Sequence, residues 1–244
     1  MNTTNNIKSC IKEYNSINTT NFTSILTRTL LCSILASNGL LNNSITSLIT
    51  AMIISPIGSL IIDLSFFLVS KILVTKKHVK ILSSLGSTSL LPMLLLLLLI
   101  IIIIILISIL YGYFYTEYYK IDLPTKEMKS RGEHYIIFET ILIAFACAIA
   151  FPSAFQKKDV STLIAIAIST ALAVPISNIG IYIGTYYNKP EYYDKKINIK
   201  NITKNNLIIF IINFIALFIA SLLYIYNRCI NFNRIKLAPQ ADFI

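Results

Sequence analysis

The chain alternates between apolar stretches of membrane length and short polar segments. At about 1.5 Å of rise per residue, roughly 20 apolar residues cross a hydrocarbon layer about 30 Å thick. Six stretches meet this length, at residues 22–41, 45–69, 89–114, 135–155, 160–186 and 205–225. The pattern predicts an all-α, polytopic transmembrane helical bundle of about six spans.

The remaining sequence divides the chain into three parts. We expect a polar N-terminal tail over residues 1–21, a six-span transmembrane domain over 22–227 and a short basic tail over 228–244. The span at 89–114 is apolar on all sides, so helical periodicity does not assign it a buried face. Tyrosines follow this span, as is typical of a membrane–water boundary.

Two of the predicted spans contain a proline with small polar residues beside it. Ser55, Pro56 and Gly58 lie in the second span, and Pro175, Ser177 and Asn178 lie in the fifth. Proline removes a backbone donor and clashes with the preceding turn, so it frees helix hydrogen-bonding groups. In hydrocarbon these groups need a partner or a watery cavity. Both segments are therefore candidate binding sites; the alternative is a pair of kinks that serve only helix packing.

The positions of the two prolines suggest an internal duplication. Each lies in the second span of a set of three, and a charged connection over 116–134 separates the sets. Because three is odd, the second set enters the membrane from the opposite side. We therefore expect a three-plus-three inverted repeat, an arrangement found in many secondary transporters.

Two acidic residues fall within predicted spans. Asp63 follows Pro56 by about two helical turns and shares its face, and Glu139 lies a few residues into the fourth span. A charge at bilayer depth costs about 2.5–3.5 kcal/mol, which makes an intramembrane carboxylate a functional candidate. Glu139 has the alternative of solvation at the headgroup level. Arg28, near the start of the first span, is expected to snorkel to the surface.

The composition argues for a membrane protein and against several other classes. Of the 244 residues, 55% are hydrophobic and 13% are charged, whereas soluble domains carry about 25% charged residues. The net charge of +10 is spread over short loops rather than gathered in a stripe, so nucleic acid is not an expected partner. Twelve of the 21 Lys and Arg lie on the side of the termini, which favours cytoplasmic termini.

The sequence contains no set of residues that indicates catalysis. The four cysteines have irregular spacing, so neither a disulfide framework nor a metal centre is predicted. No phosphate-binding loop, nucleophile elbow or paired metal-ligand motif is present. We therefore expect a protein that is not an enzyme, with no catalytic residues, bound metal or cofactor.

Two segments resemble a known membrane family. One runs through Ser33-Ile34-Leu35-Ala36-Ser37-Asn38-Gly39-Leu40-Leu41-Asn42-Asn43-Ser44 and continues to Ala51-Met52-Ile53-Ile54-Ser55-Pro56. The other is the alternating Ala and aliphatic stretch over 165–180. Their order and spacing are similar to those of the uncharacterised family called domain-of-unknown-function 389, over about residues 24–187. The resemblance implies a multi-span membrane fold and no particular activity.

The chain departs from that family at both prolines. Where the family has Met-Gly-Pro after the first proline, this chain has Ile57-Gly58-Ser59, and Val174 replaces the first of two paired prolines. These changes affect a shared site more than a shared fold.

The sequence leads to two functional hypotheses. The first is a carrier- or channel-like transporter of an ion or small solute, with its site at Ser55, Pro56, Gly58, Asp63, Glu139, Pro175, Ser177 and Asn178. The alternative is a non-transporting membrane scaffold that binds lipids or partner helices through its Leu/Ile-rich third span. In either case the expected partners are membrane lipids and further copies of the same chain.

Overall fold

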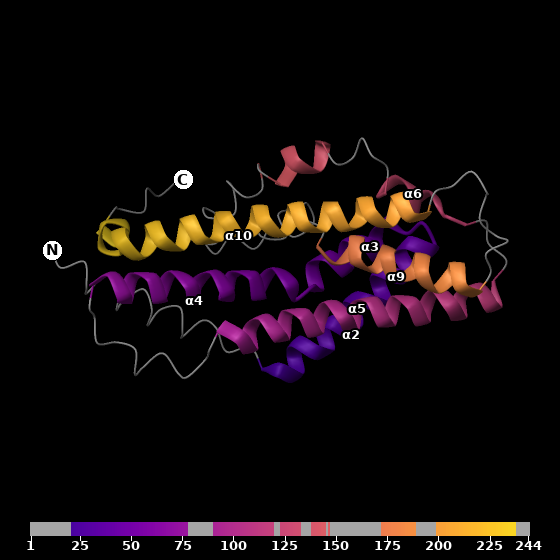
Figure 1. Cartoon of the computed structure of the whole chain (residues 1–244), viewed down its shortest axis with the longest axis horizontal. Coiled ribbons are helices and arrows are strands. Elements are labelled where there is room, and N and C mark those ends of the chain that lie inside the picture. Colours follow the sequence, from indigo (N-terminus) through magenta and orange to yellow (C-terminus); the bar gives the residue numbers. More distant parts are fainter. Residues whose placement is uncertain are drawn as a thin grey trace, which may run out of the picture.

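The computed structural model describes residues 21–77, 90–119, 123–132, 138–144, 146, 172–188 and 199–237. Within these ranges the structure is helical and contains no strand, which confirms the all-α prediction for them. The named helices are α2 (Phe22–Leu41), α3 (Ile45–Ile54), α4 (Ile57–Lys77), α5 (Leu90–Tyr118), α6 (Lys126–Ser130), α9 (Ala173–Asn188) and α10 (Ile199–Leu237) (Figure 1).

In the described part of the chain, four helical segments are long and apolar enough to cross a membrane. They are Phe22–Leu41, Ile45–Leu73, Leu90–Tyr118 and Lys200–Ile230, and they correspond to four of the six predicted spans. Their lengths of 20 to 31 residues match the thickness of a bilayer core. The described residues are thus consistent with an integral membrane protein.

The other two predicted spans lie mainly outside the described residues. Of the span at 135–155, a helical stretch over 138–144 is described, and of the span at 160–186 the structure describes α9 and the residue before it. With 16 residues, α9 is shorter than a full crossing. Six spans and an inverted repeat therefore remain predictions. α10 continues as a helix to Leu237, past residue 228, where the basic tail is predicted to begin.

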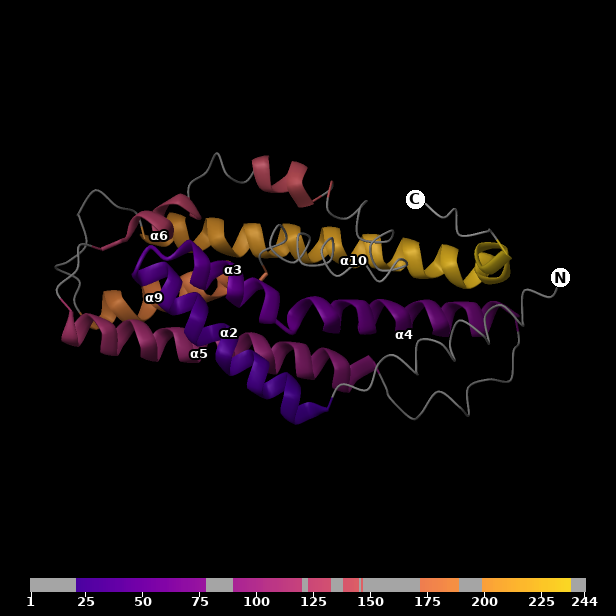
Figure 2. The same ribbon diagram turned by 180° about the vertical axis from the view of Figure 1, so that it is seen from behind.

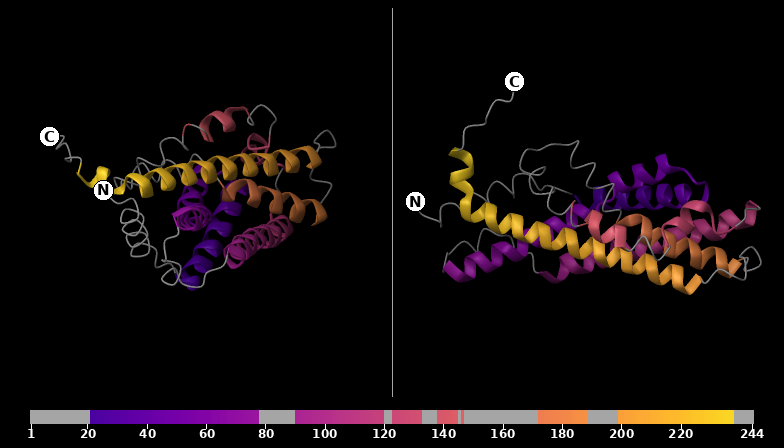
Figure 3. Two further views of the ribbon diagram at one scale, coloured as in Figure 1. Left: turned by 60° about the vertical axis from the view of Figure 1, so that its left-hand side comes forward. Right: turned by 90° about the horizontal axis from the view of Figure 1, so that it is seen from above.

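Helices α2, α5 and α9 run in the same direction, and α3, α4 and α10 run in the opposite one (Figure 1). Hydrogen bonds join three of these helices: Ser37 in α2 donates to Ser108 in α5 at 3.0 Å, and Asn188 at the end of α9 donates to Thr116 in α5 at 3.0 Å. The long helix α10 packs along both α9 and α4 (Figure 3).

Tertiary packing selects the buried face of α5, which its apolar sequence does not reveal. The buried residues follow helical spacing: Leu97, Ile100, Ile104, Ser108, Gly112 and Thr116. Most of the other side chains on this helix are exposed or half-buried, including Leu95, Leu98 and Leu106. The face toward the bundle is thus the one that carries a serine, a glycine and a threonine.

Small residues bring α5 and α9 into close contact. A Cβ atom added to Gly180 would lie 2.6 Å from Ser108 Cβ and 2.7 Å from the carbonyl oxygen of Ile105. A Cβ atom added to Gly184 would overlap the backbone of Ile109, whose Cα would be 3.0 Å away. Gly180 and Gly184 form a Gly-x-x-x-Gly motif, which allows membrane helices to approach closely.

A tight turn joins α2 to α3. Asn43 has a φ of 54°, a left-handed conformation that asparagine tolerates better than most residues. Ser44 follows as the N-cap of α3, with its side chain accepting from Ser47 N at 3.4 Å. Gly39 allows the hairpin to close, since an added Cβ would lie 2.7 Å from Leu48 Cγ.

The far halves of α4 and α10 form a second, smaller hydrophobic cluster. It contains Phe66, Val69 and Leu73 from α4 and Ile225 and Cys229 from α10. Cys229 is disulfide-bonded, which the irregular cysteine spacing did not predict, whereas Cys32 in α2 is buried and free.

Candidate functional site

The second membrane-length segment is interrupted at Ser55 and Pro56. Helix α3 ends at Ile54, and α4 begins at Ile57. Ser55 N still donates to Ala51 O at 3.0 Å, and the next helix starts with Leu60 N donating to Pro56 O at 3.2 Å. Because α3 has 10 residues, the interruption lies about 15 Å from the α2–α3 turn, which is about half a hydrocarbon thickness.

Arg28 from α2 occupies the end of α3. Its Nε donates to the carbonyl oxygen of Ile54 at 3.0 Å. In a continuous helix this carbonyl would accept from Gly58 N, so the guanidinium replaces a bond that the interruption removes. A cation also compensates the partial negative charge at a helix C-terminus. The expectation that Arg28 snorkels to the surface is therefore wrong: it is partly buried and bound to the backbone.

Two serine hydroxyls form hydrogen bonds at this interruption. Ser55 Oγ lies 3.5 Å from Ile57 N, and Ser59 donates to Pro56 O at 2.8 Å. Gly58 is half-buried, and a Cβ atom built on it would meet nothing within 4 Å. We call residues 54–59 the α3–α4 junction. Within it, Ile54 O, Pro56 O and Ile57 N have hydrogen-bond partners, and there is open space beside Gly58.

The start of α9 lies beside the α3–α4 junction. Figures 1 and 2 both place the first turn of α9 at about the same position along the bundle as the junction, and α3 contacts α9. Ile57 shares one hydrophobic cluster with Ala173, Val174 and Ile176. The two segments that the sequence singles out are thus brought together.

Pro175 does not interrupt α9 within the described residues. The helix begins at Ala173, so Pro175 lies in its first turn, where the missing N–H would have no partner within the helix. Residues 147–171 are outside the described ranges. The interruption seen at Pro56 therefore has no described equivalent at Pro175.

Ser177 and Asn178 are fully buried one turn further along α9. Asn178 Nδ2 donates to Met128 O at 3.1 Å and to Asn206 Oδ1 at 3.2 Å. Within the described part of the chain, Ser177 Oγ and Asn178 Oδ1 have no hydrogen-bond partner. Buried polar atoms of this kind are rare and costly, which makes this part of α9 a candidate for ligand or water binding.

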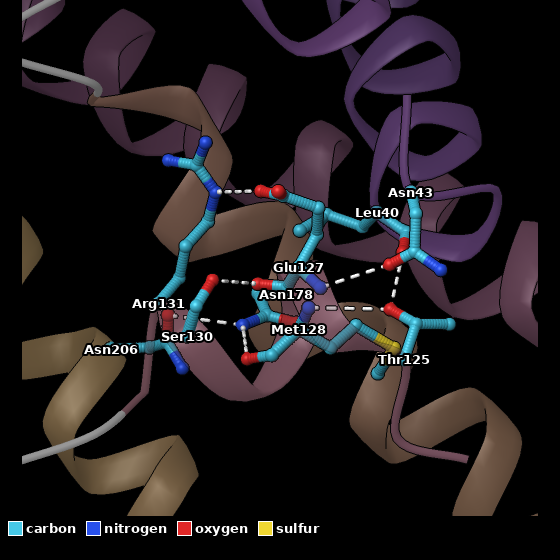
Figure 4. Close-up of polar contacts among 9 residues, drawn as sticks. All are labelled: Leu40, Asn43, Thr125, Glu127, Met128, Ser130, Arg131, Asn178 and Asn206. Carbon is cyan, nitrogen blue, oxygen red and sulfur yellow. Dashed lines mark hydrogen bonds and ion pairs between the residues drawn. The ribbon is translucent and has the colours of Figure 1, made fainter. Parts of the chain in front are cut away.

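The connection around α6 is docked into the bundle rather than lying free (Figure 4). Thr125 Oγ1 donates to Leu40 O at 2.6 Å, and Glu127 N donates to Asn43 Oδ1 at 3.0 Å. On the other side, Asn205 donates to Gly132 O at 2.8 Å. This segment thus links the end of α2 to both α9 and α10.

One ion pair lies in this docked segment. Arg131 Nε is 3.4 Å from Glu127 Oε2, with side chains that are 27% and 18% exposed. Burial lowers the pKa of Arg131, and the nearby Glu127 carboxylate opposes that change. The pair holds one turn of α6 in shape, as an i,i+4 contact does on any helix.

The two predicted acidic residues lie in different places. Asp63 is half-buried on α4, two turns beyond Pro56. Glu139 is exposed on the helical stretch 138–144, which lies across α10 from the α3–α4 junction (Figures 1 and 3). The structure places the start of α9 beside the α3–α4 junction, whereas the stretch that carries Glu139 lies apart from both.

Sequence reasoning missed three features of this region. It assigned Arg28 to the surface, described the segment around Thr125 only as a charged connection, and did not identify the Gly180–Gly184 contact. The Gly180–Gly184 contact could have been predicted from the Gly-x-x-x-Gly spacing in the sequence. The other two depend on residues that are distant in the sequence.

The geometry defines an all-helical protein with membrane-length helices and an interrupted helix at mid-length. The family model described as "Domain of unknown function (DUF389)" matches residues 52–227, and the chain belongs to this family. This confirms the resemblance seen in the sequence, although the match begins later and ends later than the residues 24–187 that suggested it. No curated protein and no solved structure matches the chain.

Proposed function

We propose that this protein is a carrier- or channel-like transporter of an ion or small solute, with its site between the α3–α4 junction and the start of α9. The observation that carries the proposal is the hydrogen bond from Arg28 to Ile54 O at 3.0 Å. It satisfies a backbone group that the interruption exposes about halfway along a membrane-length segment. An interruption at such depth requires protein or water around it.

Two further features support this proposal. Gly58 has no atoms within 4 Å of its Cβ position, so the junction is not filled by side chains at that point. Ser177 Oγ, on the neighbouring helix, is buried without a hydrogen-bond partner in the described residues. We further propose that the protein is not an enzyme and that both of its termini are cytoplasmic. Its proposed partners are membrane lipids and further copies of itself.

Water access to the junction is the most direct test. Ser59→Cys and Ser108→Cys would be introduced separately into a background with the four native cysteines replaced by alanine. Ser59 is half-buried at the junction and Ser108 is fully buried between α2, α5 and α9. We expect a membrane-impermeant thiol reagent to label position 59 at least about tenfold faster. Equal protection of both positions in folded protein would contradict a wet junction.

Flux through reconstituted protein tests transport itself. Asp63→Asn and Pro175→Leu should each lower the rate of chloride or potassium movement across liposomes. Ser130→Ala, which removes only a local bond to Glu127 O, is the matched control. If both site variants move these ions as fast as the unmodified protein, the assignment of the site is wrong.

A second candidate function, a membrane scaffold, rests on the outer surface of α5. A shallow apolar groove of about 370 Å³ lies there, lined by Ile107, Leu110, Tyr111, Phe114, Tyr115 and Tyr118. Tyr111 is held by its hydrogen bond to Asn38 at 3.1 Å, so this surface is rigid enough to receive a lipid chain or a partner helix. Two results together would favour this function over transport. One is a partner that stays bound in mild detergent but is lost in the Leu110→Ser variant. The other is equal protection of Ser59→Cys and Ser108→Cys from the thiol reagent.

A further inference from the structure

The groove on the outer side of α5 covers the depth of a single membrane leaflet. Its lining residues run from Ile107 to Tyr118, with Leu110 and Phe114 exposed between them. Over this distance the helix rises by about 16 Å, and half of a hydrocarbon layer is about 15 Å thick. Tyr118 is the last residue of α5, so the groove runs from the interior of the span to its end. A lipid of one leaflet therefore has the right length to lie along it.

The side of the groove toward α2 is held in a fixed shape. Tyr111 donates to Asn38 Oδ1 at 3.1 Å, and Tyr115 donates to Asn42 Oδ1. Asn42 Nδ2 in turn donates to Asn38 Oδ1 at 2.7 Å. The rings of Tyr111 and Tyr115 are stacked, with centroids 6.0 Å apart and an angle of 18° between their planes. Such a preformed surface favours a rigid ligand, because a flexible acyl chain loses more conformational entropy when it is held in one shape.

The groove is uncharged, and the polar groups at its end suit a hydroxyl. The lining consists of Ile, Leu, Phe and Tyr side chains, so it contains no carboxylate, ammonium or guanidinium group to pair with a charged headgroup. The Tyr115 hydroxyl uses its proton for Asn42 Oδ1 and keeps the capacity to accept. The Asn42 amide has two N–H groups, of which Asn38 takes one. This pair can therefore donate one hydrogen bond to a ligand hydroxyl and accept one from it.

The sequence of this segment has a spacing that is associated with sterols. The motif consists of a Leu or Val, a Tyr and a Lys or Arg, with one to five residues in each interval. Leu110, Tyr115 and Lys120 have this spacing, and Lys120 lies outside the described residues. Such a pattern occurs often by chance, but here both Leu110 and Tyr115 line the groove. Sequence and geometry thus indicate the same class of lipid.

We propose that the α5 groove binds a sterol, with its fused rings along Ile107, Leu110 and Phe114 and its hydroxyl between Tyr115 and Asn42. A sterol has the required properties, namely the length of one leaflet, a rigid apolar body, no charge and a hydroxyl at one end. The inference goes beyond transport and names the lipid for the surface on which the second candidate function rests. Its test uses neither flux nor water access to the α3–α4 junction, so either proposal can fail without the other.

Tryptophan fluorescence tests the proposal directly, because the chain contains no Trp. Ile103→Trp places a single reporter one turn before Ile107, on the side of the groove and just beyond its inner end. Ile102→Trp is the matched control, because this exposed position lies at nearly the same depth but about 100° further around the helix, away from the groove. Both variants would be reconstituted into phosphatidylcholine vesicles that contain a small fraction of cholesterol brominated in its side chain, which quenches Trp on contact.

We expect quenching of Ile103→Trp to be at least about threefold stronger than that of Ile102→Trp, because a bound sterol holds its side chain at the inner end of the groove. Unlabelled cholesterol should remove the difference by competition. Equal quenching at the two positions would mean that sterol surrounds the helix only as bulk lipid, and it would overturn the proposal. Quenching of Ile102→Trp alone would show that protein, such as a second copy of the chain, covers the groove, and it would overturn the proposal too.

The hydroxyl contact is tested at Tyr115. Tyr115→Phe keeps the ring and removes the hydroxyl, so about threefold more brominated sterol should be needed for half-maximal quenching of Ile103→Trp. Tyr113→Phe is the control, because it removes a hydroxyl from an exposed position on another side of α5 and should leave this value unchanged. The same value in Tyr115→Phe as in the unmodified background would contradict the placement of the sterol hydroxyl.

The class of lipid is tested by replacing the brominated sterol with brominated phosphatidylcholine. We expect this lipid to quench Ile103→Trp and Ile102→Trp equally, since it meets both positions as bulk lipid. Preferential quenching of Ile103→Trp would identify an acyl chain as the occupant of the groove and refute the sterol.

Discussion

Glycine has opposite surroundings in two neighbouring regions, the α5–α9 interface and the α3–α4 junction. At the interface, Gly184 leaves no room for a Cβ atom because the backbone of Ile109 occupies that space. At the junction, Gly58 has nothing within 4 Å of its Cβ position. Glycine serves close helix packing in the first region, whereas in the second it borders open space. The bundle therefore combines a tightly closed contact with a junction that is open on the side of Gly58.

The largest expected effect breaks the closed contact. Gly184→Ala places a methyl group against the Ile109 backbone, which cannot move aside as a flexible side chain can. We expect a loss of about 3 kcal/mol in the free energy of unfolding, measured by chemical denaturation in detergent. Gly58→Ala is the control and should be neutral or stabilise by up to about 1 kcal/mol. Similar losses in both variants would mean that the two glycines do not differ as described.

Removing the cation from the junction should have the next largest effect. Arg28→Met keeps much of the side-chain length but leaves Ile54 O without its donor. An unsatisfied buried carbonyl costs about 1–3 kcal/mol, so we expect a loss in that range by the same measurement. A loss near zero would show that water, rather than Arg28, satisfies the end of α3.

The amide of Asn178 connects the start of α9 to the docked segment around α6. Asn178→Leu removes both of its hydrogen bonds and leaves Met128 O without that donor. We expect a loss of about 1–2 kcal/mol and faster amide hydrogen exchange over residues 125–132. Ser130→Ala, whose hydroxyl bonds only within its own turn, should leave the exchange pattern unaltered. Unchanged exchange in Asn178→Leu would indicate that Thr125 and Asn205 alone hold the segment.

The smallest effect is expected at Ser59. Its hydroxyl donates to Pro56 O at 2.8 Å, a local bond at a half-buried position that water can replace. Ser59→Ala should therefore lower the free energy of unfolding by no more than about 0.5 kcal/mol. A loss as large as that of Gly184→Ala would mean that the junction is as dry and closed as the α5–α9 interface.

Much of the architecture follows from the sequence because its causes are local. A backbone in hydrocarbon must satisfy its own hydrogen bonds, so apolar stretches of about 20 residues become helices whatever surrounds them. The same reasoning located the interruption at Pro56, since a missing N–H affects the turn in which it stands. At Pro175 the interruption stays a prediction, because this proline lies in the first turn of α9 and residues 147–171 are outside the described ranges.

The remaining features depend on residues that meet only in three dimensions. α5 is apolar all round, so its buried face was chosen by contact with the small residues of α9 rather than by any period of its own. Arg28 was expected at the surface because its partner, Ile54 O, exists only where another helix ends. The segment around α6 looked like a charged loop because Leu40 O, Asn178 and Asn205 are far from it in the chain.

The lengths of the described spans and the interruption beside Pro56 were thus determined by the sequence alone, because both depend on bonding within one helix. The tertiary structure decided which faces are buried, which charge caps the interrupted helix and how the connection is held. Those outcomes are set by contacts between helices, and a single apolar helix has no means of specifying its neighbour.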